Sequence, residues 1–272
     1  MEHVHARHDE LPGQLTLHVG DEELLLDRAR PRVRPNELVV APVELHKRNV
    51  QRRLRERSAS KGAFEFEDPV GASRSVLDET NVPSKAIDRI DRLALVRSLL
   101  TESESREAAR VSLPPGVPSR DPQSVEQLRT EVEALTNFHP ERVGAWRSGA
   151  ESLYEPIDAE SERQLDAALD VERALRERTS KAVSEAELVR RATRAITATE
   201  GSAWSDAYPE IERLTLVGVS SLSAPHADLV HSLLLATSLE IHVHFRRGTG
   251  EFLRSRTPAL LDVTSPGREV FE

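Results

Sequence analysis

The densest cluster of side chains with potential chemistry is basic and lies between Val43 and Arg57. Val43, Val50 and Leu54 recur at helical spacing, which predicts a helix whose other faces hold the cations. Because lysine and arginine neutralise phosphate groups, this density of positive charge predicts a nucleic-acid contact. The alternative is a solvated face, since cations near a helix C-terminus also complement the helix dipole. The candidate nucleic-acid-binding residues are Lys47, Arg48, Arg52, Arg53, Arg55 and Arg57.

The segment after the first expected strand does not form a phosphate-binding loop. Apolar and polar residues alternate from Leu15 to Val19, which predicts a strand that ends at Gly20. A P-loop at this point requires glycines followed by Lys and by Ser or Thr. The segment 19–24 reads VGDEEL instead, and no lysine precedes Lys47. Its carboxylates would repel a triphosphate, so we expect no ATP binding.

The acidic residues that bind Mg²⁺ in nucleotide hydrolases are missing from their expected place as well. The apolar run from Leu214 to Val219 predicts a buried strand, and Ser220 and Ser221 follow it where Asp and Glu would be needed. We therefore predict no catalytic residues and no cofactor, and we favour a protein that is not an enzyme. A ligand-binding enzyme stays open, because doubly wound sheets bind ligands beyond the carboxyl ends of their strands.

Three other groups of residues have side chains that can bind a metal. They are His3, His5 and His8; His226, His231, His242 and His244; and Asp88 and Asp91. The first group belongs to a polar tail. The imidazoles of the second group could hold zinc, but the polar face of an edge strand usually explains such residues. The two aspartates have the spacing of a helix, whereas a Mg²⁺ site would need them at the end of a strand. We expect no metal.

The segment from Ile211 to Phe245 predicts the architecture that positions these residues. Its first strand is followed by Ser223 and Pro225, which are typical of a helix start. Alternation from Leu239 to Phe245 then marks a second strand. Strand, helix and strand form a βαβ unit, which is the basis of a parallel sheet. The predicted fold class is therefore α/β.

Shorter elements come before this unit. We expect a short helix at Leu24–Leu26, a buried strand at Leu38–Ala41, a loop or short strand at Phe64–Ser73, a long helix capped by Ser84, and helices that begin with capping boxes at Ser124 and Ser184. A proline-rich run at 111–123 marks a boundary, and no strand-like run occurs between 121 and 205. The expected divisions are a polar tail (1–13), a first α/β part (14–120), an all-helical insertion (121–205), a second α/β part (206–260) and a tail (261–272).

Composition limits the class of protein. The chain has 272 residues, of which 38 % are hydrophobic and 31 % charged, and it has no cysteine. No apolar run approaches the roughly 18 residues of a membrane helix, and the N-terminus lacks the apolar core of a signal peptide. We expect a cytoplasmic protein without membrane contact. Among 37 basic residues 4 are lysine, leaving 37 − 4 = 33 arginines, and the net charge is −9; this bias is typical of salt-loving or GC-rich organisms.

Several segments together indicate a family. They are Leu38–Pro42, a buried strand that ends in Pro; Ser84–Arg89 with the helix through Leu100; and Leu216–Ser223 followed by Asp228–Leu234, a strand, turn and helix. In this pattern the chain resembles the N-terminal, helicase-like half of AddB-like subunits of ATP-dependent helicase–nucleases, whose relatives are inactivated superfamily 1 helicases. The resemblance implies a degenerate P-loop-helicase-like sheet with an all-helical insertion. It departs from the family at Val219, where an aromatic is common, and in lacking the phosphate loop.

The leading functional hypothesis is a non-catalytic helicase-like scaffold, or a DNA-contacting component, of a DNA-repair helicase–nuclease assembly. Its partners would be DNA and a helicase or nuclease subunit. Two alternatives stay open, namely a stand-alone α/β ligand-binding enzyme of the doubly wound class and a purely structural partner-binding protein. Nucleotide binding would favour the enzyme.

Overall fold

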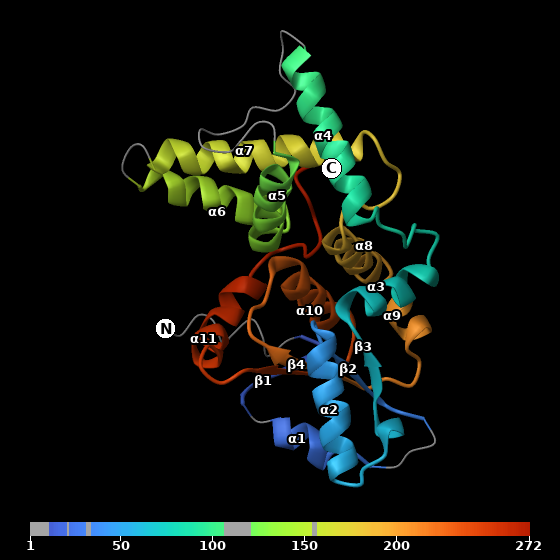
Figure 1. Ribbon diagram of the computed structural model, residues 1–272. Coiled ribbons are helices and arrows are strands. Elements are labelled where there is room, and N and C mark those ends of the chain that lie inside the picture. The colour runs from blue at the N-terminus through green and yellow to red at the C-terminus, as the bar shows by residue number, and fades with distance from the viewer. Residues whose placement is uncertain (1–10, 21, 31–33, 106–120, 154–156) are drawn as a thin grey trace.

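A computed structural model describes residues 11–20, 22–30, 34–105, 121–153 and 157–272. Within these residues the chain forms a five-stranded sheet covered by helices (Figure 1). The strands are β1 (Gln14–Val19), β2 (Glu37–Val40), β3 (Glu65–Glu67), β4 (Arg213–Val219) and β5 (Glu240–Phe245). Their order across the sheet is β1-β5-β4-β2-β3, and every neighbouring pair is parallel. The predicted α/β class with a parallel sheet is confirmed.

The described helices are more numerous than the sequence pattern predicted. They are α1 (Glu22–Asp27), α2 (Glu44–Glu56), α3 (Pro69–Asp78), α4 (Arg89–Ser105), α5 (Pro122–Thr136), α6 (Pro140–Glu151), α7 (Ile157–Arg176), α8 (Glu185–Ala198), α9 (Ser202–Ala207), α10 (Ala224–Ala236) and α11 (Gly250–Leu261), with a 3₁₀ turn at Lys61–Ala63. None of them combines the length and apolarity needed to cross a membrane.

The predicted βαβ unit is confirmed as β4, α10 and β5. The two strands are adjacent and parallel, with Leu214 opposite Ile241 and Leu216 opposite Val243. The pairing is irregular between Leu216 and Val219, where Gly218 adopts a φ of 68°. This bulge makes Leu216 and Val219 both face the same core.

Two apolar cores cover the two faces of the sheet. On one face, Leu25 and Leu26 of α1 and Val50 and Leu54 of α2 pack against Val39 and Val217. On the other face, α3, α8, α9, α10 and α11 contribute to a larger core around β2, β4 and β5. Helices therefore lie on both faces, as a parallel sheet requires.

The helices α4 to α7 form a bundle to one side of the sheet, drawn in green and yellow in Figure 1. Their own apolar clusters join α4, α5 and α7 around Val125 and Leu175, and α5, α6 and α7 around Val132 and Leu165. Between α3 and β4 the described chain has no strand, and Ala86 and Ala182 make an isolated bridge.

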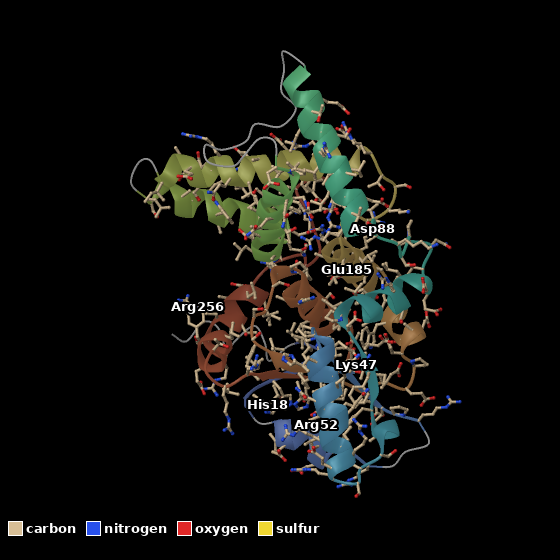
Figure 2. The ribbon with its side chains drawn as sticks, in the orientation of Figure 1. His18, Lys47, Arg52, Asp88, Glu185 and Arg256 are labelled. Atoms are coloured by element: carbon tan, nitrogen blue, oxygen red, sulfur yellow. The ribbon has the colours of Figure 1, made fainter. Side chains whose placement is uncertain are left out.

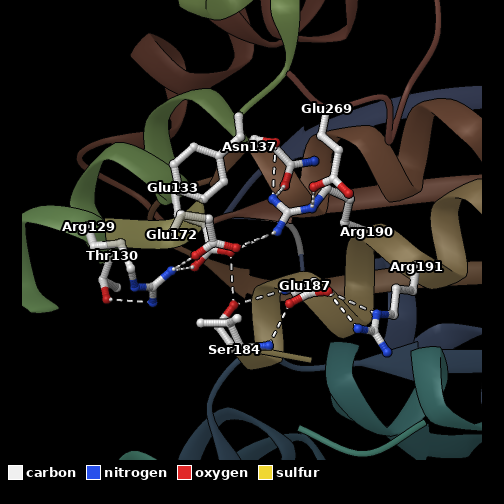
Figure 3. Close-up of polar contacts among 12 residues, drawn as sticks. Arg129, Thr130, Glu133, Asn137, Glu172, Ser184, Glu187, Arg190, Arg191 and Glu269 are labelled. Carbon is white, nitrogen blue, oxygen red and sulfur yellow. Dashed lines mark hydrogen bonds and ion pairs between the residues drawn. The ribbon is translucent and has the colours of Figure 1, made fainter. Parts of the chain in front are cut away.

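A buried network of arginines and glutamates connects this bundle to α8 and to the C-terminal segment (Figure 3). Arg129 of α5 contacts Glu133 at 3.0 Å and Glu172 of α7 at 2.8 Å. Arg190 of α8 contacts Glu133 at 3.1 Å and Glu269 at 3.0 Å. All five side chains are buried, so each charge depends on its partners for the hydrogen bonds that water would otherwise supply.

Two expected helix starts are wrong. The long helix begins at Arg89 and is capped by Asp88, whose Oδ1 accepts the N–H groups of Ile90 and Asp91. The stretch after Ser84 is not helical, because the N–H of Ile87 donates to the distant carbonyl of Ala182 and not to a carbonyl of a preceding helical turn. Likewise α5 begins at Pro122, and its N-cap is Asp121, whose side chain accepts the N–H of Ser124. Aspartate is as good an N-cap as serine, so a sequence with both allowed either start.

Candidate nucleic-acid interface

The helix α2 has the predicted amphipathic character. Val50 and Leu54 are buried against the sheet, and the cations occupy its other sides. Val43, which was expected on the apolar side, is the N-cap and is 50 % exposed, because it lies before the first helical turn.

The six candidate nucleic-acid-binding residues fall into three groups according to the groups that they contact. Arg53 and Arg57 form ion pairs with Glu23 of α1, and Arg57 also contacts Asp27 at 2.8 Å. Lys47 and Arg48 lie 3.8 Å and 3.0 Å from Glu44 of the same helix. Arg52 lies 3.8 Å from Glu56, and Arg55 donates to the backbone carbonyl of Gln51.

These partners decide which cations can reach a ligand. Arg53 and Arg57 join α1 to α2, so carboxylates of α1 already neutralise their charge. Arg48, Arg52 and Arg55 are exposed, and exposed pairs within one helix contribute about 0.3–0.5 kcal/mol each. A phosphate could therefore replace the carboxylates of Glu44 and Glu56 at little cost. Figure 2 marks Lys47 and Arg52 on this helix.

The end of β1 has no phosphate cradle among the described residues. Gly20 has a φ of 76°, and the side chain of Arg247, from the turn after β5, lies directly over it. The α1 helix that follows presents Glu23 and Asp27, both of which face Arg57. An arginine stem thus occupies the space above the glycine, and carboxylates line the adjoining helix.

The end of β4 is equally unlike a Mg²⁺ site. The ring of His46 from α2 lies against Gly218, and the exposed Ser220 and Ser221 follow. Within the described parts of the chain, no group of three or more His, Asp or Glu residues has an arrangement suited to a metal ion.

The four central histidines considered as zinc ligands do not converge. His242 and His244 lie on the β5 face turned away from the larger core, where both stack with His18 of β1. The His18 and His242 rings also share a 2.9 Å hydrogen bond. His226 and His231 belong to α10, which packs on the opposite face of the sheet. The sheet itself therefore separates the two pairs.

Asp88 and Asp91 also have a structural explanation. The N–H groups of Asp91 and Ile90 lower the pKa of the Asp88 carboxyl, as expected for a carboxylate that caps a helix. The remaining group, His3, His5 and His8, lies outside the described residues.

An open cleft of about 430 Å³ lies beyond the carboxyl ends of β2, β3 and β4. The first turns of α2, α3, α8 and α10 line it, and helix N-termini favour anions. Yet Glu44, Asp68 and Glu185 line the cleft as well, opposed by Arg74. Its charge therefore does not suit a phosphate group.

A second cationic surface, which the sequence pattern did not reveal, lies on the turn after β5 and on α11. It consists of Arg246, Arg247, Phe252 and Arg256, and we call it the β5–α11 surface; all four side chains are exposed. In the sequence this segment is typical of a turn followed by a tail. No helix is predicted there because Pro258, which lies inside α11, is disfavoured in the interior of a helix. The available signal was a single aromatic, Phe252, within a segment that holds four arginines, Arg246, Arg247, Arg254 and Arg256.

The whole sequence, residues 1–272, matches a family described as Halobacterial UvrD-like protein. No curated protein matches it. The family match relates the chain to UvrD-like helicases, in agreement with the helicase-like part of the resemblance, and it does not single out AddB-like subunits.

Proposed function

Since the chain belongs to the halobacterial UvrD-like protein family, we propose that it is a helicase-like DNA-contacting scaffold that does not use ATP. The observation that supports DNA contact is the outward side of α2, where Arg48, Arg52 and Arg55 are exposed and have at most weak partners. The absence of a cradle at the described end of β1 supports a role without ATP.

Phosphate binding by α2 would be electrostatic and independent of sequence. Each cation that neutralises a phosphate of a single strand adds about 0.7 to the magnitude of the slope of log affinity against log salt. The three outward arginines would therefore give a binding that weakens steeply as salt rises.

Fluorescence anisotropy with a labelled oligonucleotide at several salt concentrations tests this proposal. The triple variant Arg48→Glu, Arg52→Glu and Arg55→Glu should bind more weakly and with a flatter salt slope. The matched control replaces three exposed arginines from other parts of the chain with Glu, namely Arg34, Arg147 and Arg173. Equal losses in both triple variants, or no salt-dependent binding by the unaltered protein alone or with its partner, would refute DNA contact by α2.

The assembly in which the protein acts would be a DNA-repair helicase–nuclease complex, with a helicase or nuclease subunit as partner. The relation to UvrD-like helicases supports this choice. The test is purification of the natural complex from the source cells, followed by identification of its subunits. A complex without any DNA-processing subunit would contradict it.

A further inference from the structure

We propose that the free edge of β1 binds an extended, acidic segment of a partner protein, which adds a strand to the sheet. β1 is the outermost strand on one side of the sheet, and among the described residues it pairs with β5 alone. Proteins commonly bind extended segments by adding them to an exposed sheet edge in this way. The inference goes beyond DNA contact by α2 and does not depend on it.

The backbone of β1 is open on the side that faces away from β5. The N–H groups of Gln14 and Gly20 donate to β5 carbonyls at 2.9 Å and 2.8 Å, and the register between the two bonds is continuous. Because hydrogen-bonding groups alternate in direction along a strand, the even-numbered positions from 14 to 20 bond to β5. The N–H and C=O groups of Leu15, Leu17 and Val19 therefore point outward, where the described chain offers them no further strand.

The two edges of the sheet differ in how well they are protected. The other edge strand, β3, has only three residues, and two of them are Glu65 and Glu67. β1 has six residues, none of which is Asp, Glu, Lys, Arg or Pro, and its pairing with β5 shows no bulge. Natural sheets protect their edges with short strands, charges, prolines or bulges. β1 has none of these features, so its edge is suited to pairing with another chain.

The side chains of β1 are incompletely covered as well. β4 and β5 are buried apart from the first residue of each strand, whereas no side chain of β1 is fully buried. The helix α11 lies beside β1 (Figure 1), and its Gly250 packs against Val19. Two residues later Phe252 is 62 % exposed. A further strand with alternating apolar residues would extend the larger core past β1 and cover this apolar surface.

Charge favours an acidic partner over a second copy of this chain. The β5–α11 surface adjoins the edge, since the stem of Arg247 lies over Gly20 at the carboxyl end of β1. The segment 246–256 contains four arginines and a single carboxylate, Glu251, which pairs with Arg254. A second copy that paired through its own β1 would bring no carboxylate to these arginines, because β1 has none. A partner segment with Asp or Glu next to its apolar residues would.

The first test is fluorescence anisotropy of the full protein with a labelled peptide of about ten residues, in which alternating Val and Thr are flanked by Glu. This peptide should bind with a dissociation constant in the micromolar range. The same peptide with Lys in place of Glu should bind about tenfold more weakly, because it meets Arg246 and Arg247 with like charge. Arg246→Ala with Arg247→Ala should remove the difference. A peptide with Pro at alternate positions should not bind, because Pro has no N–H to donate.

The second test changes the edge itself. Thr16→Lys gives β1 the kind of charge that protects natural edges, and Thr16 is exposed, so the melting temperature should stay unchanged. This variant should bind the Glu-flanked peptide about tenfold more weakly or worse, whereas the matched control Thr16→Val should retain the affinity. In the unaltered protein, hydrogen exchange followed by mass spectrometry should show that the peptide protects residues 14–20 and leaves residues 65–67 unaffected.

The outcomes separate this inference from its alternatives and from the proposed function. No peptide binding, equal binding by Thr16→Lys, or protection of residues 65–67 alone would overturn it. A Lys-flanked peptide that binds as tightly as the Glu-flanked one would overturn the acidic partner. So would a concentration-dependent dimer in sedimentation velocity that Thr16→Lys dissociates, because it would assign the edge to a second copy. DNA binding by Thr16→Lys should equal that of the unaltered protein, so either proposal can fail without the other.

Discussion

Arg142 of α6 and Asp228 of α10 form an ion pair in which Nη2 lies 2.6 Å from Oδ1. Asp228 has no exposed surface, and it also accepts hydrogen bonds from Asn137 Nδ2 at 2.6 Å and from the N–H of Gly267. This single carboxylate joins the helical bundle, the helix on the sheet and the C-terminal segment. Together with the Arg190 contacts to Glu133 and Glu269, it helps to fix the position of the bundle relative to the sheet.

Arg142→Ala should destabilise the protein by about 3 kcal/mol, because it leaves a buried carboxylate without its cation. The control is Arg147→Ala on the same helix, whose 3.0 Å pair with Asp166 is exposed and should contribute less than about 1 kcal/mol. Urea unfolding measures both values. Equal midpoints for the two variants would contradict the structural role of the buried pair.

Acid should unfold the protein partly through Glu269. Burial alone would raise the pKa of this carboxyl, but ion pairs with Arg176, Arg190 and Arg194 lower it to about 2 from an ordinary value of 4.5. Because the folded pKa is depressed, the stabilisation is present above about pH 4.5 and is lost as the pH falls toward 2. It amounts to on the order of 3 kcal/mol.

Glu269→Gln removes this titration. The variant should melt at a lower temperature at pH 7, and its melting temperature should fall less between pH 5 and 3 than that of the unaltered protein. Circular dichroism melts at several pH values provide the measurement. Parallel curves for the two proteins would show that Glu269 is not the titrating group.

Two glycines should respond to alanine in opposite directions. At Gly218 the φ of 68° and the ring of His46 leave no room for a Cβ, so Gly218→Ala should cost about 1–3 kcal/mol. At Gly144 in α6 no atom lies within 4 Å of an added Cβ, so Gly144→Ala should stabilise by about 0.5–1 kcal/mol. A destabilised Gly144→Ala, or a neutral Gly218→Ala, in denaturant unfolding would argue against this geometry.

Titration calorimetry with Mg·ATP should detect no binding. The space above Gly20 is filled by the Arg247 stem, and the cleft beyond β2, β3 and β4 is lined by carboxylates. A dissociation constant in the micromolar range or tighter would revive the ligand-binding enzyme as the leading function. Arg247→Ala, which opens the space, should not create binding, because no lysine replaces the missing cation.

The sequence by itself determined the strands and the helices whose pattern is local. Alternation from Leu15 to Val19, the apolar run in β4 and the spacing of Val50 and Leu54 each reflect one element burying one side, so they are visible without knowledge of the partner. The α/β class and the amphipathic, basic character of α2 followed from these patterns.

Tertiary structure alone decided which charges are free. Arg53 and Arg55 are indistinguishable in the sequence, yet Arg53 faces Glu23, thirty positions earlier, and Arg55 faces solvent. Arg129 and Glu133 of α5 have the spacing of an ordinary solvated face, and they are buried because α7 and α8 bring further charges against them. Pairing between distant residues depends on how helices pack. The sequence of one helix shows where its arginines are, but it does not show which of them pair with a carboxylate from another helix.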